Sequence, residues 1–268
     1  MVTWLESKRL PVEKPKNSEE VILDQVGLEL YEKFFLGYTI KQWKCHPRDL
    51  DASVCGRIPI RTNRDDRYLK ERFQALPKDG YTAMFGRMID DCGDLLQIRL
   101  QSDYRELTGL DWGHMIYTGP IDAFYEFRFG QLPYRSLRFE HESFSKNELK
   151  NYENISGKAG FYQPAMQVNY PNEYDYTRIV EVKHATGQIC ENSTIVKEYP
   201  EDFGPGKEPY YPVPNSTSKE LYHKYKALAD EESHVSFVGR LATYKYYNMD
   251  QVVGMALSEF EKQSSRVN

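Results

Sequence analysis

The sequence predicts a mixed α and β protein with helices at both ends and an antiparallel sheet between them. Three patterns support this fold class. Apolar residues in the segment 21–39 recur with helical spacing, several segments between 96 and 200 alternate like half-buried strands, and the last segment carries a long apolar stripe. With 268 residues, the chain can form one large domain or two ordinary ones.

The N-terminal third is expected to be largely helical. Residues 1–20 are polar, contain two prolines and are expected to form a loose leader. A helix is predicted over 21–39, because Val26, Leu30 and Phe34 recur four residues apart. A short β-like segment follows at 57–63, and a second helix is predicted within 79–91, with Thr82 as its N-cap.

Strand signals dominate the middle of the chain. In the first such segment, Leu96, Ile98 and Leu100 alternate with polar residues. The others are HMIYTGPID (114–122), YRSLRFEHESF (134–144), YTRIVEVKHATG (176–187) and STIVKEYP (193–200). Residues 202–214 are rich in Pro, Gly and Tyr and are expected to be a loop before a polar helix at 219–232.

The last segment joins a strand-like run, a glycine turn and a helix. The run spans 234–238, the turn is Gly239–Arg240, and Asn248 is the predicted N-cap of the helix. The apolar stripe of this helix is Met249, Val252, Val253, Ala256, Leu257 and Phe260. A junction of this kind can bind phosphate, but no G-x-G-x-x-G occurs in the sequence to hold the rest of a nucleotide.

Composition and missing motifs exclude several classes of function. Lys plus Arg number 35 and Asp plus Glu 40, so the net charge of −5 argues against a nucleic-acid partner. The sequence contains no C-x-x-C, H-E-x-x-H or G-x-S-x-G, so neither a metal site nor a serine hydrolase is indicated. Without a signal-like run or a stretch of membrane-spanning length, we expect a cytoplasmic protein with no membrane partner.

Two clusters could bind an aromatic, anionic ligand. In FFLGYTIKQW (34–43), the rings of Phe34, Phe35, Tyr38 and Trp43 could stack on a base, although their spacing alone favours core aromatics. Arginines could grip a diphosphate through paired hydrogen bonds, although a solvated surface is the commoner fate of any one of them. They are Arg57, Arg61, Arg64, Arg67 and Arg178, with the hydroxyl of Tyr68 nearby.

Six ordered motifs resemble those of UDP-galactopyranose mutases. They are GYTIKQW, RIPIRTNRDDRY, YTGPID, NYPNEYDYTRI, EYPEDFGPGKEPYYPVP and GRLATYKYYNMDQVV, and they cover nearly the whole chain. The resemblance implies a partial Rossmann-like FAD-binding domain, a remnant of a helical lid and a twisted antiparallel sheet. It assigns 1–50 to the helical substrate-lid remnant, 51–105 and 125–205 to the sheet, and 106–124 and 206–268 to the FAD-binding remnant.

The resemblance also implies a reaction and its partners. The family interconverts UDP-galactopyranose and UDP-galactofuranose by covalent catalysis through N5 of reduced FAD. Family members carry a G-x-G-x-x-G unit that is absent from this sequence, so we expect a truncated or split mutase. A separate N-terminal FAD-binding half and a second copy in a homodimer are the expected protein partners. The alternative is a flavin-free UDP-sugar-binding module or an inactive fragment.

Residue roles follow from the matching motifs. Catalytic roles are implied for Arg57, Arg178 and Trp43. The implied substrate-binding residues are Phe34, Phe35, Tyr38, Thr39, Trp43, Arg57, Tyr68, Asn169, Arg178, Tyr210 and Tyr246. The implied FAD-binding residues are Gly239, Arg240, Tyr246, Asn248, Met249 and Asp250. This interpretation requires Tyr38, Arg57, Arg178 and Tyr246 to come together around one site.

Overall fold

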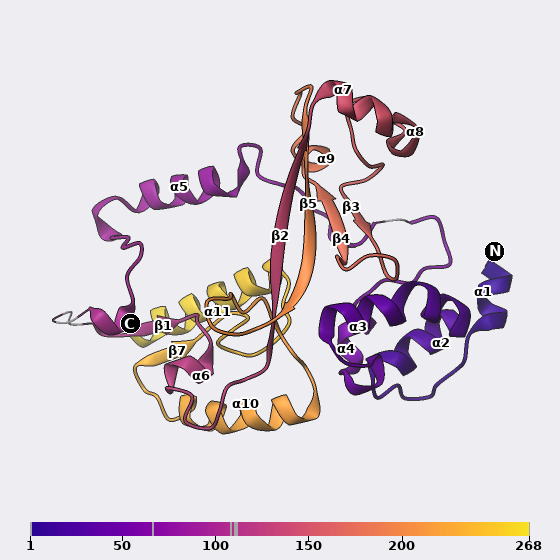
Figure 1. The fold of residues 1–268 in the computed structure, drawn as a ribbon. Coiled ribbons are helices and arrows are strands. Elements are labelled where there is room, and N and C mark those ends of the chain that lie inside the picture. Colours follow the sequence, from indigo (N-terminus) through magenta and orange to yellow (C-terminus); the bar gives the residue numbers. More distant parts are fainter. Residues whose placement is uncertain (1, 66, 108, 110–111, 268) are drawn as a thin grey trace.

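The computed structural model describes residues 2–65, 67–107, 109 and 112–267. Figure 1 shows helices α1 to α4 on one side of two long strands, β2 and β5, and a smaller group of β1, β7, α6, α10 and α11 on the other side. Helix and antiparallel sheet both occur, as the sequence predicts. No helix in the described part of the chain is both long and apolar enough to cross a membrane.

The N-terminal region is helical and has its own core. Its elements are α1 (Val2–Lys8), α2 (Ser18–Leu30), the π-helical η1 (Tyr31–Leu36), α3 (Gly37–Trp43), the 3-10 turn η2 (Pro47–Asp49) and α4 (Ala52–Gly56). The predicted loose leader therefore includes a helix. Helix α2 begins earlier than predicted because the side chain of Asn17 accepts a hydrogen bond from Glu20 N at 2.9 Å and caps it.

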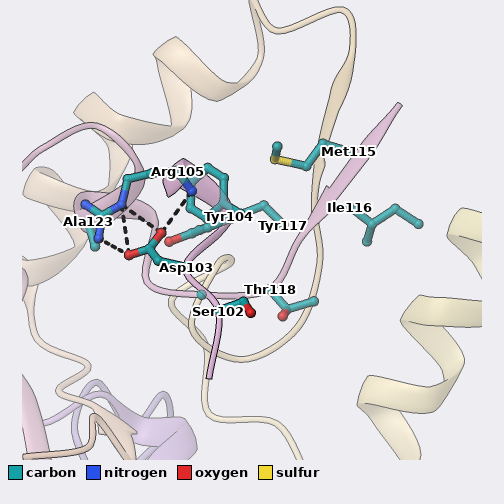
Figure 2. Close-up of a pocket in the computed structure, with 10 residues that line it drawn as sticks. Ser102, Asp103, Tyr104, Arg105, Met115, Ile116, Tyr117, Thr118 and Ala123 are labelled. Atoms are coloured by element: carbon teal, nitrogen blue, oxygen red, sulfur yellow. Dashed lines mark hydrogen bonds and ion pairs between the residues drawn. The ribbon is translucent and has the colours of Figure 1, made fainter. Parts of the chain in front are cut away.

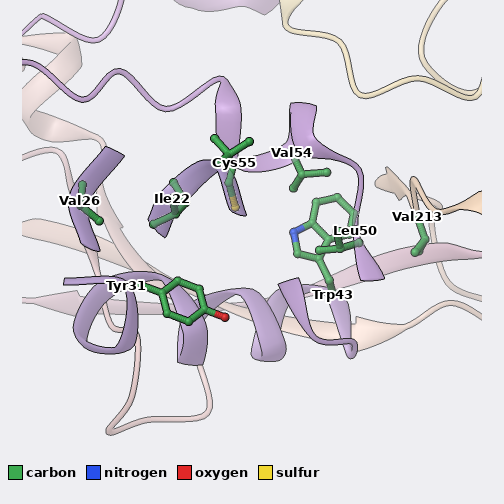
Figure 3. Packing of buried hydrophobic residues seen from close by; sticks show 9 residues of the cluster. Ile22, Val26, Tyr31, Trp43, Leu50, Val54, Cys55 and Val213 are labelled. Carbon is green, nitrogen blue, oxygen red and sulfur yellow. The ribbon is translucent and has the colours of Figure 1, made fainter. Parts of the chain in front are cut away.

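Apolar side chains from these helices meet in one cluster, shown in Figure 3. Ile22 and Val26 of α2, Trp43 of α3 and Val54 of α4 are all buried there. Val213, far along the chain, packs into the same cluster. The helical region is thus fixed to the segment that leads into the C-terminal part, so residues of α3 and of the C-terminal third can share one site.

A five-stranded antiparallel sheet forms the middle of the molecule, with the order β3-β4-β5-β2-β6. Its strands are β2 (Tyr134–Phe144), β3 (Gln167–Asn169), β4 (Arg178–Glu181), β5 (Ser193–Asp202) and β6 (Tyr211–Pro212). The predicted strands at 134–144 and 193–200 are confirmed. Strand β4 is shorter than predicted because α9 (Lys183–Thr186) follows it, and β6 lies inside the predicted loop.

A smaller parallel pair of strands lies beside the C-terminal helices. Strand β1 (Met115–Tyr117) pairs with β7 (Val235–Phe237), and both carboxyl ends point the same way. The helices around this pair are α6 (Ile121–Phe124), α10 (Ser216–Ala229) and α11 (Met249–Val267). The short helical elements elsewhere are η3 (Gly93–Leu95), η4 (Tyr104–Glu106), α7 (Lys146–Leu149), η5 (Lys150–Tyr152) and α8 (Glu153–Ser156).

Two predicted strands, at 57–63 and at 96–100, are wrong, because both segments are irregular. Leu96 and Leu100 are 43% and 82% exposed, so the alternation there has no partner strand and no core to face. The second predicted helix exists as α5 (Gly80–Cys92), but it follows Asp79 and contains Thr82, which is therefore not its N-cap.

Asp51 links the helical region to α10, and its pKa predicts how the stability of the chain depends on pH. Its carboxylate accepts a hydrogen bond from Ser53 N at 2.9 Å, which caps α4, and another from the ammonium of Lys219. Burial would raise the pKa of Asp51, but the hydrogen bonds from Lys219 and Ser53 outweigh it and lower the pKa from 3.8 to about 2. Stability from this group is therefore present above about pH 4 and lost as the pH falls through about 2.

We expect Asp51→Asn to lower the thermal unfolding midpoint at pH 6 and to match the unsubstituted chain near pH 2. Differential scanning calorimetry at pH 6, 4 and 2 measures this. Asp230→Asn is the control, because it removes an exposed pair with Lys226 whose worth is at most about 0.5 kcal/mol. A midpoint difference for Asp51→Asn that stays constant over this pH range would contradict the prediction.

Candidate functional site

A row of side chains crosses one face of the large sheet. Asn169 of β3 lies opposite Arg178 of β4, and Arg178 lies opposite Glu198 of β5. Phe139 of β2 is the next partner of Glu198. Directly paired residues project from the same face of a sheet. The row therefore places an amide, a guanidinium, a carboxylate and an aromatic ring side by side.

Arg178 is held within this row by its neighbours. Its Nε lies 2.9 Å from Glu198 Oε2, and its Nη1 donates to Gln167 Oε1 at 3.3 Å. The contact with Glu198 is an ion pair without hydrogen-bond geometry, so Nε has no hydrogen-bond acceptor among the described residues. Only 18% of the Arg178 side chain is exposed. The sheet neighbours therefore hold the guanidinium in place, and its small exposed part is what a ligand could reach.

Burial also acts on the partners of Arg178. It raises the pKa of Glu198, and the positive charge of Arg178 opposes that rise. Burial likewise raises the pKa of Tyr38, while the charges of Arg178 and Arg57 lower it. The charges of both arginines therefore act on the phenol of Tyr38.

Tyr246 connects the sheet side of the site to the C-terminal turn. The guanidinium carbon of Arg57 lies 4.1 Å from the centre of its ring, and Arg57 Nη2 donates to its hydroxyl at 3.0 Å. Arg240 approaches the same ring at 5.0 Å. Trp43 and Tyr211 contact it at centroid distances of 5.9 and 5.2 Å. Two cations and three rings therefore converge on one point.

The C-terminal turn is anchored by Arg240. Its Nη1 donates to the carbonyl of Tyr210 at 3.2 Å, and its Nη2 donates to the carbonyl of Tyr247. Gly239 has φ of 96°, a left-handed conformation that favours glycine. Helix α11 begins only at Met249, so the turn does not lead directly into a helix, as a simple phosphate cradle would. Both Met249 and Asp250 are exposed.

Two cavities lie around the carboxyl end of β1. One, of about 380 Å³, is lined by the Gly239–Arg240 turn, by Thr118 and by apolar residues of α11. Figure 2 shows the other, of about 430 Å³, in which the segment 102–105 approaches Thr118. Hydrogen bonds from Arg105 lower the pKa of Asp103 there to about 2. The carboxyl ends of parallel strands are where α/β sheets bind ligands.

The rings of the aromatic segment 34–43 are divided between the surface and the core. Phe34 is 51% exposed, whereas Phe35 packs against the core cluster and Trp43 is buried within it. The cause is η1, because its π-helical turns are wider and residues four apart no longer lie above one another. Of the four candidate stacking rings, Tyr38 is subject to the charges of Arg178 and Arg57, and Trp43 contacts the ring of Tyr246.

The remaining predicted residues are placed unevenly. Thr39 is buried beside Cys55, and Asn169 accepts a hydrogen bond from Gln167 Nε2 at 3.1 Å. The ring of Tyr210 lies 5.7 Å from Phe139, at the end of the row. Within the described chain, Tyr68 is half exposed and contacts none of the rings or arginines that converge on Tyr246. Asn248 precedes α11, and its carbonyl accepts from Val252 N at 3.2 Å.

Sequence reasoning missed three residues of this arrangement: Glu198, Tyr211 and Gln167. Glu198 follows from pairing the segments 176–187 and 193–200 as a hairpin, because an acid then faces Arg178. Tyr211 neighbours the predicted Tyr210, and its burial raises its pKa to about 12. Among the described residues, no three His, Cys, Asp or Glu side chains come together to hold a metal.

Known proteins resemble this chain over most of its length. The family model described as UDP-galactopyranose mutase matches residues 33–246. A probable UDP-galactopyranose mutase of Klebsiella pneumoniae is 38% identical over 256 residues, which cover 95% of this chain and 62% of that protein. A dTDP-fucopyranose mutase of Escherichia coli is 34% identical, over 92% of this chain and 63% of that protein.

The fold is similar to that of a solved relative. A crystal structure of reduced UDP-galactopyranose mutase aligns with a TM-score of 0.58 at 15% sequence identity, over 91% of this chain and 67% of that one. This likeness confirms the predicted fold. The chain spans less than two thirds of the length of the two curated relatives above. Because the family model matches most of the sequence, the chain belongs to the UDP-galactopyranose mutase family.

Proposed function

We propose that this chain forms the nucleotide-sugar site of a mutase that interconverts UDP-galactopyranose and UDP-galactofuranose. The observation that supports this most directly is the convergence of Tyr38, Arg57, Arg178 and Tyr246, which come from four separate segments. Two arginines with adjacent phenols suit a diphosphate flanked by a planar base. The names of the relatives support the same class of substrate.

Each side chain has a role in this proposal. Arg57 and Arg178 bind the diphosphate, and the ring of Tyr38 supports the uracil. Glu198 holds Arg178 in place within the sheet. Asn169 offers its amide to a sugar hydroxyl. When the sugar–phosphate bond breaks, negative charge grows on the leaving diphosphate, and preorganised guanidinium groups stabilise that charge most strongly.

FAD would lie beside Tyr246, where the chain offers one side of a cofactor site. Reduced flavin supplies the nucleophile for the anomeric carbon when it is bound. The cavity lined by Gly239, Arg240 and Thr118 and the N-terminus of α11 fit the flavin end of such a group. The described residues lack a glycine-rich turn that leads into a helix, which is what a pyrophosphate needs.

An N-terminal FAD-binding unit would therefore complete the site. A parallel sheet is normally covered on both faces, yet Ile116 of β1 is 54% exposed. Along α11, Val253, Leu257 and Phe260 are also more than half exposed. These apolar residues are where we expect such a unit to pack. A cytoplasmic location and a homodimer stay predictions.

A flavin-free UDP-sugar-binding module is the second candidate. It is favoured by one observation: Arg57 contacts Tyr246 within this chain, whereas Met249 and Asp250 on the proposed cofactor side are exposed. Mixing the chain with the FAD-binding unit of a relative separates the two. A yellow complex that converts UDP-galactofuranose to the pyranose supports the mutase, and binding of UDP without flavin uptake supports the module.

Isothermal titration calorimetry of the chain with UDP tests the proposed substrate class. We expect saturable binding of UDP and much weaker binding of ADP, because the two relatives are named for sugars linked to pyrimidine nucleotides. The titration includes dTDP, since one relative is named for a dTDP sugar. Tighter binding of dTDP than of UDP would change the proposed sugar nucleotide, and binding of neither would refute the proposal.

A further inference from the structure

The loop of residues 170–176 joins β3 to β4, so its two ends carry Asn169 and Arg178 of the cross-strand row. The sheet holds the loop on one side. Tyr170 N donates to Thr177 O at 2.9 Å, and the ring of Tyr176 contacts that of Tyr199 on β5 at 5.7 Å. The loop therefore lies directly beside two residues of the row.

The other side of the loop is held by Lys41 of α3. Its ammonium donates to three backbone carbonyls, those of Tyr170, Tyr174 and Tyr176, the last two at 2.8 and 3.1 Å. An ammonium has three N–H donors, and each of them has an acceptor here. Burial lowers the pKa of Lys41, while the carboxylates of Glu173 and Asp175 in the same loop raise it.

Contacts near the start of α3 reinforce this attachment. Asn172 Nδ2 donates to the carbonyl of Lys33, in the π-helical η1, at 3.1 Å. A Cβ on Gly37 would lie only 2.7 Å from Pro171 O, so the loop backbone rests directly on the helix. The loop and the helix thus touch at several points, and Lys41 provides the only ammonium bonded to the loop among the described residues.

We propose that Lys41 is a positioning residue of the substrate site. It fixes α3, which carries Tyr38, against the loop whose ends carry Asn169 and Arg178. The base-stacking ring and the diphosphate-binding arginine belong to different elements, and Lys41 sets the spacing between them. This inference rests on the proposed function for its consequence in binding, but the attachment itself does not depend on any ligand.

Hydrogen exchange with mass spectrometry tests the attachment in the ligand-free chain. Lys41→Met removes the three donors at nearly constant length, and we expect the amides of 170–177 to exchange at least about tenfold faster. Lys44→Met is the matched control, because Lys44 ends the same helix and makes only an exposed pair with Asp202. Its exchange in 170–177 is expected to equal that of the unsubstituted chain.

UDP titration then tests the role in positioning. We expect Lys41→Met to weaken UDP binding about tenfold, which corresponds to one lost alignment of about 1.4 kcal/mol, and Lys44→Met to leave it unchanged. Lys41→Arg keeps the charge but replaces three tetrahedral donors by a planar fork, so it should show faster exchange in 170–177 with unchanged exchange in α2. This variant carries the test if Lys41→Met does not fold.

The outcomes separate the two ideas. Unchanged hydrogen exchange in 170–177 for both Lys41→Met and Lys41→Arg would overturn the attachment. Faster exchange with unchanged UDP affinity would overturn the positioning role and leave Lys41 a structural residue. If the unsubstituted chain binds no UDP, the proposed function and the positioning role built on it both fail, while the exchange data still decide whether Lys41 holds the loop.

Discussion

Replacing Arg178 by alanine is expected to weaken UDP binding by about 30-fold to several thousand-fold, or ~2–5 kcal/mol. Arg178 is a largely buried cation at the centre of the row, held there by its ion pair with Glu198. Its loss removes a charge-assisted bond to the diphosphate and leaves Glu198 without a counter-charge. Calorimetric titration with UDP measures the change in Kd.

Arg138→Ala is the matched control for this substitution. Arg138 lies on β2 next to Phe139, so it projects from the opposite face of the same sheet, where it pairs with Glu140 and Glu201. We expect it to leave the Kd for UDP unchanged. Equal loss of affinity in Arg138→Ala and Arg178→Ala would show that general positive charge, rather than the row, holds the ligand.

Adding Glu198→Gln to Arg178→Ala separates the effect on UDP binding from the effect on stability. Arg178→Ala leaves the carboxylate of Glu198 half-buried and unpaired, and burial already raises its pKa. The variant should therefore gain stability relative to the unsubstituted chain as the pH falls through the raised pKa of Glu198, because the carboxyl group then becomes neutral. Adding Glu198→Gln should restore stability at neutral pH without restoring UDP affinity, since the amide cannot replace the guanidinium.

Sequence patterns predict correctly those elements that are strongly periodic and that also find a partner in the fold. The long strands β2 and β5 alternate and have each other as neighbours, so both are confirmed. The segment 96–100 has the same alternation but no neighbouring strand, so it stays irregular. An alternating pattern thus indicates which face of a segment could be buried. The segment becomes a strand only where a neighbouring strand pairs with it.

The sequence names candidate site residues one by one, but it does not show the neighbours that hold them in place. Resemblance pointed to Arg57, Arg178 and Tyr246, and the structure brings them together through Tyr38. The π-helical turn η1 was not visible in the spacing, because a segment of six residues is too short to show a repeat that differs from that of an α-helix. Cross-strand partners such as Glu198 follow only once two strands are paired in register, which the pattern of a single strand does not provide.

Gly37→Ala is expected to destabilise the chain by about 1–3 kcal/mol, although the same substitution inside an ordinary helix stabilises it. Gly37 has helical φ and ψ of −63° and −43°, so backbone conformation does not require glycine there. The added Cβ would lie 2.3 Å from Asn172 Oδ1 and 2.7 Å from Pro171 O. The amide of Asn172 can rotate away, but the carbonyl of Pro171 belongs to the loop backbone and must move with it.

Gly254→Ala provides a control of opposite sign. Gly254 lies within α11, and a Cβ there would meet no other atom within 4 Å. We expect this variant to gain about 0.4–1 kcal/mol in the free energy of unfolding, because alanine loses less backbone entropy in a helix. Urea denaturation of both variants measures the difference. If Gly37→Ala were stabilised as well, the loop 170–176 would not rest on α3 at this distance. The attachment that sets the spacing between Tyr38 and Arg178 would then depend on hydrogen bonds without the backbone contact at Gly37.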